Sequence, residues 1–230
     1  MPRLEPLDRD LWIADGPAVS FFGFPYPTRM AVIRLPSGEL WVWSPIALDD
    51  AMATALAALG PVAHLVAPNK LHHLFLADWK ARWPAARLYA APGLARRRRD
   101  LAFNAELGDL PDSAWATVVD QIVVRGSPVM AEVVFFHRPS RTALVTDLVQ
   151  RFDPATARGW RGWIMRADGL VGPRGSTPRE WRLTFVDRRA ARAARAHVLA
   201  WDPVRVVIAH GEWIRARGRE ELAQALAWMG

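Results

Sequence analysis

The sequence contains no cysteine among its 230 residues, which excludes disulfide bonds, thiolate metal ligands and a cysteine nucleophile. Any metal ion must therefore be held by histidine, carboxylate or water ligands. Long apolar runs are also missing, because no stretch approaches the roughly 20 residues that span a bilayer. Residues 1–15 lack the apolar core of a secretory signal. These absences predict a soluble, cytoplasmic protein without a membrane partner.

Lysine is scarce, since Lys70 and Lys80 are the only two in the chain. The formal charge of +7 at neutral pH consequently comes from arginine. Arginine binds phosphate and carboxylate groups, but a uniform arginine excess also follows from genomic codon bias, which we favour for most of it. The four arginines at residues 96–99 have no interleaved aromatic residues. They indicate a solvated loop more than a nucleic-acid contact.

Length and hydrophobic content favour one large domain over residues 1–230, since 51% of the residues are hydrophobic and can form a substantial core. Strand and helix signals alternate along the chain. The expected strands cover residues 11–14, 31–35, 40–43, 62–66, 87–91, 122–124, 132–137, 142–147 and 204–209. The expected helices cover residues 50–59, 71–82, 188–202 and 219–229, and a turn is expected at residues 15–17. Residues 152–182, rich in Gly, Pro, Arg and Trp, are expected to form an insertion or lid over a cleft.

Side chains that can bind a metal follow three of the expected strands. His72 and His73 lie where an apolar strand gives way to a helix, Asp147 ends a second strand, and His210 follows a third. Loops at strand ends can direct side chains into one cleft while the strands hold them still. We therefore expect an α/β sandwich with the site at one rim.

The order of these elements resembles that of the metallo-β-lactamase fold superfamily. Three strings, at residues 67–73, 132–140 and 208–211, are similar to an uncharacterised branch of it, the DUF4336 type. The resemblance spans nearly the whole chain. It implies an αββα four-layer sandwich with a metal site built from histidine and aspartate side chains.

The chain departs from the superfamily motif His-x-His-x-Asp-His, because residues 68–73 read Pro-Asn-Lys-Leu-His-His. The first two histidines are missing, and no histidine stands near residues 127–128, where the third ligand of the usual first metal site is expected. The residues that correspond to the second metal site are His72, in place of the aspartate, His73, Asp147 and His210. The resemblance implies one divalent ion, with zinc first and iron or manganese as alternatives, or no ion at all.

The charges of the candidate ligands limit how tightly such a site can bind a metal ion. Asp147 alone balances the divalent ion when His72 replaces an aspartate, so the metal affinity should be lower. Lys70 stands where a first-site ligand is expected, and its ammonium would partly replace the missing ion. One metal with one fixed cation suits a small anionic or carbonyl-bearing ligand. Neighbouring side chains point about 100° apart on a regular helix, so His72 and His73 share one ion only if the backbone bends there.

Three functions remain open from the sequence. The first is a mononuclear metal-dependent hydrolase of an ester, amide or phosphoester, with Lys70 and Asp147 as catalytic groups. The second is a non-catalytic protein of the same fold that binds a ligand or partner. The third, ranked last, is a nucleic-acid-binding module that uses residues 96–99 and 188–195. The substrate and the oligomeric state are not specified.

Other residues near these motifs are expected to have supporting roles. His64 should lie in the core, His137 should pair within its own loop, and His197 should be exposed on a helix. Glu132 and Asp78 are alternative candidates for orienting a ligand histidine, as carboxylates often do. Trp160 and Trp163 are candidates for lining the lid, and the remaining tryptophans are expected in the core and in the walls of the cleft.

Overall fold

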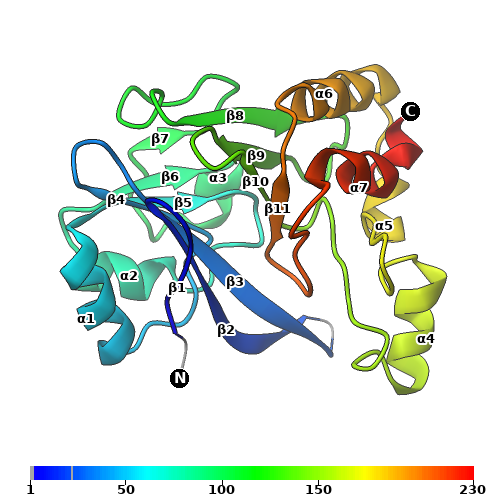
Figure 1. Ribbon diagram of the computed structural model, residues 1–230, viewed down its shortest axis with the longest axis horizontal. Helices are drawn as coiled ribbons and strands as arrows, with labels where there is room; N and C mark the ends of the chain where they lie inside the picture. Colours follow the sequence, from blue (N-terminus) through cyan, green and yellow to red (C-terminus); the bar gives the residue numbers. More distant parts are fainter. Residues whose placement is uncertain (1–2, 22) are drawn as a thin grey trace.

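The computed structural model describes residues 3–21 and 23–230, which form two β-sheets with helices on their outer faces (Figure 1). The first sheet contains, in spatial order, β1 (Glu5–Asp8), β2 (Leu11–Phe21), β3 (Phe24–Arg34), β4 (Leu40–Trp43), β5 (Val62–Ala67), β6 (Arg87–Ala90) and β7 (Ala105–Glu106). The second contains β11 (Arg205–Ile208), β10 (Thr142–Val145), β9 (Glu132–His137) and β8 (Val119–Val124). The helices are α1 (Asp50–Leu59), α2 (Leu76–Arg82), α3 (Leu94–Arg97), α4 (Gly159–Ala167), α5 (Arg179–Arg182), α6 (Arg188–Ala200) and α7 (Gly218–Ala225), followed by a 3₁₀ turn at Ala227–Met229.

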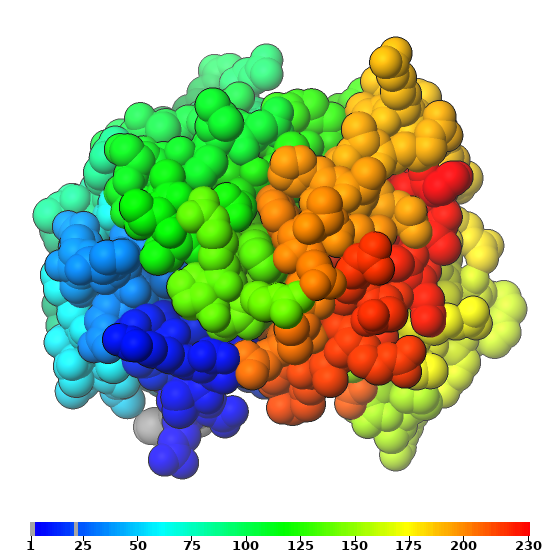
Figure 2. Space-filling model, turned by 45° about the horizontal axis from the view of Figure 1, so that its top comes forward, coloured from blue at the N-terminus to red at the C-terminus, as the bar shows by residue number. Residues whose placement is uncertain are grey.

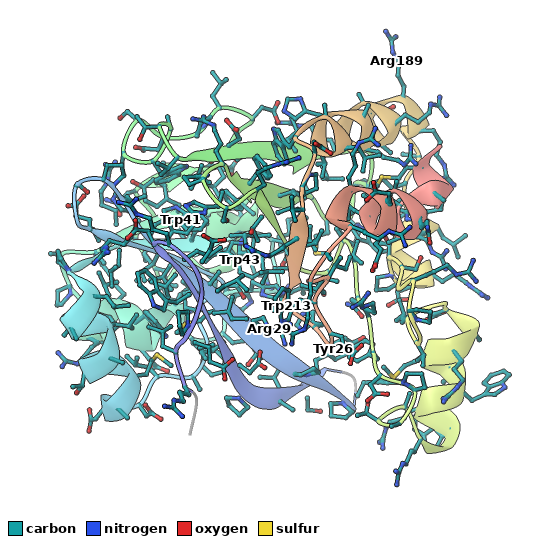
Figure 3. The ribbon with its side chains drawn as sticks, viewed as in Figure 1. Tyr26, Arg29, Trp41, Trp43, Arg189 and Trp213 are labelled. Carbon is teal, nitrogen blue, oxygen red and sulfur yellow. The ribbon has the colours of Figure 1, made fainter. Side chains whose placement is uncertain are left out.

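Strand β4 shows why the two sheets pack face to face. Trp41 and Trp43 are fully buried between the sheets, and the ring of Trp41 packs edge-on against Phe135 of β9. Leu40 and Val42 point to the opposite face and pack beneath helices, as the alternation of side chains along a strand requires. Figure 3 shows both tryptophans near the centre of the molecule. A strand that reads Leu-Trp-Val-Trp is therefore buried on both faces.

Helices complete the two outer layers. Leu56 of α1 and Trp79 of α2 pack on the first sheet, whereas Val198 of α6 and Leu222 of α7 pack on the second. Helix α1 begins after Asp49, whose carboxylate accepts a hydrogen bond from a backbone N–H three residues later. The layer order is helix, sheet, sheet, helix, which confirms the predicted αββα sandwich.

The two sheets meet at the rim where the site residues lie. β5 runs parallel to β4 and β6, and β10 runs parallel to β11. A bridge between Asn69, just past β5, and Glu132, at the start of β9, joins the sheets. Distant segments therefore lie side by side. Figure 2 shows orange atoms of the C-terminal part against the blue N-terminal residues. Arg205 of β11 also pairs with Asp8 of β1.

The turn expected at residues 15–17 is wrong. Strand β2 continues to Phe21, and its pairing with β3 shifts register between Gly16 and Val19. A Cβ atom at position 16 would lie 2.4 Å from Thr28 Oγ1, so glycine permits the close approach of the two strands. A glycine beside a proline here marks a bulge in a long strand instead of its end.

Residues 152–182 contain α4 and α5 and lie at one end of the sandwich (Figure 1). Trp181 is buried, whereas Trp160 and Trp163 are 61% and 70% exposed and are not among the residues that line the cavity described below. A single domain over residues 1–230 with an insertion here stays a prediction. Among the residues that the structure describes, no helix has both the length and the apolar character needed to cross a bilayer.

The histidines outside the site have the positions expected of them. His64 is buried in β5, with Nδ1 3.2 Å from the Tyr89 hydroxyl, and His197 is exposed on α6. His137 is buried at the end of β9, with Nδ1 2.8 Å from Ser140 Oγ in the adjoining turn. Burial lowers the pKa of His137 to about 4, so its ring is neutral at pH 7.

We expect His137 to destabilise the protein in mild acid. Its folded-state pKa of about 4 lies below the usual 6.5, so its stabilisation is complete above pH 6.5 and is lost as the pH falls toward 4. Between about pH 7.5 and about pH 5, the loss should be about 2 kcal/mol in the free energy of unfolding. Urea unfolding of wild type and His137→Asn at both pH values measures this contribution. The same pH dependence in both proteins would contradict it.

Candidate metal centre

Three of the predicted ligands, His72, Asp147 and His210, converge at the rim of the sandwich. They form the metal-capable group found among residues 3–21 and 23–230, and we call them the ligand cluster. His72 Nε2 lies 3.3 Å from Asp147 Oδ2, and His210 Nε2 lies 3.4 Å from Asp147 Oδ1. The two Nε2 atoms are 3.2 Å apart. All three side chains are nearly inaccessible to solvent.

These separations suit a metal ion. Zinc–nitrogen bonds of about 2.0–2.1 Å place two ligands of a tetrahedron about 3.3–3.4 Å apart. Two imidazole nitrogens at 3.2 Å repel each other unless a proton or a cation lies between them. Two histidines and one carboxylate leave the fourth tetrahedral position open, as in catalytic zinc sites. The donor set therefore fits one divalent ion.

His210 is positioned by the first sheet. Its Nδ1 donates a 2.7 Å hydrogen bond to the carbonyl of Pro27, and the ring of Tyr26 packs edge-on against it at 5.3 Å between centroids. Arg29 of β3 donates to the carbonyl of Gly211, the next residue after His210. Figure 3 shows Tyr26 and Arg29 beside the segment that follows β11. Because Nδ1 carries the hydrogen, Nε2 of the neutral ring offers its lone pair to a metal.

His72 lies in an irregular turn between β5 and α2. The helix expected from residue 71 begins at Leu76 instead, because the side-chain oxygen of Asn69 accepts hydrogen bonds from the backbone N–H groups of Leu71 and His72. His72 Nδ1 lies 2.7 Å from Ser44 Oγ at the end of β4. Ser44 has a φ of 52°, which is uncommon for a residue other than glycine. Asn69 therefore fixes the backbone of this turn, and Ser44 fixes the His72 ring.

The amide of Asn69 connects this turn to the loop of Asp147. Asn69 Nδ2 lies 2.7 Å from Asp147 Oδ2, 2.8 Å from Thr146 Oγ1 and 3.2 Å from Glu132 Oε2. Glu132 is fully buried and accepts backbone N–H hydrogen bonds from Thr146, Asp147 and Leu148 at 2.8, 2.8 and 3.0 Å. The carboxylate of Glu132 therefore holds the loop of the ligand aspartate instead of a ligand histidine.

Burial and mutual contact set the charges of the cluster. Burial alone would raise the pKa of Asp147, but hydrogen bonds from His210 and His72 hold that pKa well below its usual value. Burial opposes protonation of His210, yet the contact with Asp147 raises its pKa, whereas burial dominates at His72 and lowers the pKa there. Burial, with the charge of Asp147, raises the pKa of Glu132 to about 7. A metal ion would have to compete with a proton on His210, so metal binding would weaken in acid.

The sequence has a family match. The family described as "Domain of unknown function (DUF4336)" matches residues 12–158, more than half of the chain. The chain belongs to the DUF4336 family. A comparison with curated protein sequences finds no match.

Solved structures show that this DUF4336 chain shares the fold of metallo-beta-lactamases, as its sequence resemblance implied. It matches the metallo-beta-lactamase from Pontibacter korlensis with a TM-score of 0.65 and 12% identity, covering 100% of this chain and 99% of that chain. It matches the enzyme from Hirschia baltica with a TM-score of 0.64 and 13% identity, covering 99% and 97%. FIM-1 from Pseudomonas aeruginosa, in its mono-zinc form, gives 0.65 and 11% identity, covering 99% and 94%. These identities show the shared fold alone.

His73, the fourth predicted ligand, is not part of the ligand cluster. Its Nδ1 lies 3.0 Å from Nη1 of Arg98, which also donates to the His73 carbonyl at 2.9 Å. A guanidinium group only donates, so Nδ1 accepts and the ring hydrogen lies on Nε2. Burial and the charges of Arg98 and Arg97 lower the pKa of His73. In this DUF4336 chain His73 therefore offers a hydrogen-bond donor, and the predicted set of four ligands reduces to three that converge.

A cavity of about 580 Å³ adjoins the ligand cluster, which lines part of it. Lys70, predicted as a catalytic residue, lies in its wall and donates a 3.3 Å hydrogen bond to the carbonyl of Val129. Gln150 also lines the cavity and donates to Asp147 Oδ1 at 3.0 Å. Much of the remaining wall is apolar, with Val19, Leu71, Leu74, Phe75, Met130 and Trp181. This size and lining are typical of small-molecule sites.

Three supporting residues, Ser44, Asn69 and Gln150, were not singled out from the sequence. Ser44 directly follows β4, and Asn69 follows β5 by two residues. Polar residues just past a buried strand and close to predicted ligands were the available signal for both. Gln150, three residues after Asp147, gave no signal of its own.

We expect His72→Ala, Asp147→Ala and His210→Ala each to weaken zinc binding by more than about 100-fold, because each removes a converging ligand. His73→Ala is the matched control and should change the affinity by less than about threefold, since its Nδ1 is engaged by Arg98. Competition with a chromophoric chelator measures these affinities. A loss in His73→Ala as large as that in His72→Ala would show that the ligand cluster is assigned incorrectly.

We expect Asn69→Ala to lower the zinc affinity by about 10- to 100-fold, because Asp147 and the His72 turn lose their shared support. The free energy of unfolding should also fall by about 2–3 kcal/mol, since buried partners are left without a donor. Asn104→Ala is the control, because Asn104 accepts a hydrogen bond from the Leu88 backbone away from the site. It should lose stability and keep its zinc affinity. Equal zinc affinity in both variants would exclude the supporting role of Asn69.

Proposed function

We propose that this protein is a hydrolase that uses one divalent metal ion held by His72, Asp147 and His210. The observation that carries the proposal is the convergence of three side chains, whose nearest nitrogen and oxygen atoms lie 3.2–3.4 Å apart, with an adjoining cavity large enough for a small molecule. The substrate belongs to the esters, amides or phosphoesters. The mono-zinc form of FIM-1, which shares the fold, is consistent with a one-metal centre.

When bound, such an ion supplies Lewis-acid activation, lowering the pKa of a coordinated water to about 7 and polarising a carbonyl or phosphoryl oxygen. The residues of the chain orient the ligands. Pro27 and Ser44 contact the Nδ1 atoms of the two histidines, which leaves both Nε2 atoms for the ion. Asn69 and Gln150 donate to different oxygens of Asp147 and fix its carboxylate. A ligand that covers the apolar wall would exclude bulk water from the reacting groups.

Zinc is our first choice of metal, and iron or manganese are the alternatives. The ligand cluster carries one carboxylate, so a divalent ion in it keeps a net positive charge. That charge favours a bound anion or the developing negative charge of a hydrolytic transition state. The Lys70 ammonium donates a hydrogen bond to the Val129 carbonyl. Its role in stabilising an oxyanion stays a prediction.

A non-catalytic ligand-binding protein of the same fold is the second candidate. It is favoured by the missing first metal site, since Pro68 and Lys70 stand at two of its ligand positions. Both candidates share the cavity, and they differ in whether metal-dependent turnover occurs.

Elemental analysis followed by chelation and refeeding with zinc, iron or manganese tests the proposal. We expect one metal ion per chain, and hydrolysis of at least one member of a chromogenic ester, amide and phosphoester panel that chelation removes and refeeding restores. Asp147→Asn should lower that activity by at least about 100-fold, since it removes the only carboxylate ligand. The absence of stoichiometric metal after refeeding would refute the proposal. Stoichiometric metal without turnover on the whole panel would favour the second candidate.

A further inference from the structure

We propose that Lys70 and Arg97 form an anion-binding subsite in the wall of the cavity, and that the protein's ligands carry a carboxylate or phosphate group on an apolar body. The inference deepens the proposed function, and it rests on that function only in treating these ligands as substrates. Both cations line the same cavity as His72, Asp147 and His210. An anion held there would place the rest of the ligand beside the ligand cluster.

The two cations have no carboxylate partners within the described parts of the chain. Lys70 Nζ donates to the Val129 carbonyl at 3.3 Å, which leaves two of its three N–H donors for a ligand. Arg97 forms no ion pair there, whereas its neighbour Arg98 pairs with Asp100 at 2.7 Å. Several other arginines are also paired, as Arg125 and Arg138 are with aspartates. Because no carboxylate neutralises either cation, both keep their charge for an anion that enters the cavity.

The structure holds the Lys70 ammonium in place. A Cβ atom added at Gly93 would lie 2.8 Å from Lys70 Cε and 3.2 Å from its Nζ, so the side chain lies directly against the bare glycine backbone. The Val129 carbonyl fixes its other side. A cation that is already immobilised loses little conformational entropy when an anion binds.

His73 supports the same subsite. Arg98 engages its Nδ1, so the Nε2 atom of this cavity-lining ring carries a hydrogen and acts as a donor. Glu180 also lines the cavity and brings one negative charge. Lys70 and Arg97 outnumber this exposed carboxylate, and the charge of Asp147 would be offset by the divalent ion that the ligand cluster is proposed to hold. The balance of the wall is therefore positive.

The apolar side chains of the cavity wall indicate that the remainder of the ligand is apolar. Leu74 and Val129 are 56% and 60% exposed although both line the cavity, and Trp181 and Met130 form a buried part of its surface. Exposed apolar side chains next to a cavity mark a surface that a ligand covers. A purely polar anion would leave these side chains in water, whereas an apolar acid or phosphate ester would cover them.

Two fluorescent probes with the same apolar body test the inference, namely anilinonaphthalene sulfonate and its uncharged parent N-phenylnaphthylamine. Sulfonate is a weak metal ligand, so its binding reports on the protein cations. We expect the double variant Lys70→Met, Arg97→Gln to weaken sulfonate binding by about tenfold, equivalent to about 1.4 kcal/mol, and to leave binding of the parent unchanged. Arg96→Gln is the matched control, because Arg96 lies on the same helix and does not line the cavity.

Equal loss of sulfonate binding in Arg96→Gln would overturn the subsite, since it would reflect the general charge of the protein. Unchanged binding of both probes in the double variant would also overturn the subsite. Displacement of the sulfonate probe by hexanoate or by hexyl phosphate supports the subsite and identifies which anion it prefers. Displacement by neither overturns it.

All titrations are run on the full chain, both as purified and after chelation. If the preference for the sulfonate probe over the uncharged parent persists after chelation and disappears in the double variant, the preference is due to Lys70 and Arg97. Preference that disappears on chelation and persists in the double variant assigns it to the metal and overturns the subsite. Preference that persists in a protein without metal-dependent hydrolysis keeps the subsite and rejects the proposed function, so the two failures are distinguishable.

Discussion

The buried carboxamide of Asn69 is the contact on which the geometry of the site depends most. It joins the turn after β5 to the loop after β10 by touching Asp147, Thr146 and Glu132 at once. A buried polar group is costly unless it is hydrogen-bonded, and a buried carboxylate is costlier still. Glu132 is tolerated because it accepts three backbone N–H groups and approaches the Asn69 amide. These hydrogen bonds therefore connect the two sheets at the position where the side chains of the ligand cluster converge.

The proposed function rests on the charge balance of that rim. The ligand cluster offers two imidazoles and one carboxylate, which is enough to hold a divalent ion and too little to neutralise it. The cavity beside it adds Lys70 and Arg97 to an apolar wall. A site with excess positive charge and an apolar approach selects for ligands that are negative at one end and apolar at the other.

The sequence was informative where physical rules act locally. Short apolar segments predicted most strands, and the helix expected over residues 50–59 is α1. The order of His72, Asp147 and His210 after buried strands predicted three residues that converge. The sequence could not decide whether His72 or His73 is the ligand. The choice depends on the turn that Asn69 imposes and on the hydrogen bond between Arg98 and His73. Such side-chain contacts join residues distant in the sequence, and no local pattern encodes them.

The most direct test of the central claim is anomalous diffraction at the zinc edge from crystals grown with zinc. The account predicts one peak per chain, about 2.0–2.1 Å from Nε2 of His72 and of His210 and about 2.0–2.2 Å from an oxygen of Asp147. A peak that is ligated by His73 instead, or no peak at this rim, would contradict it.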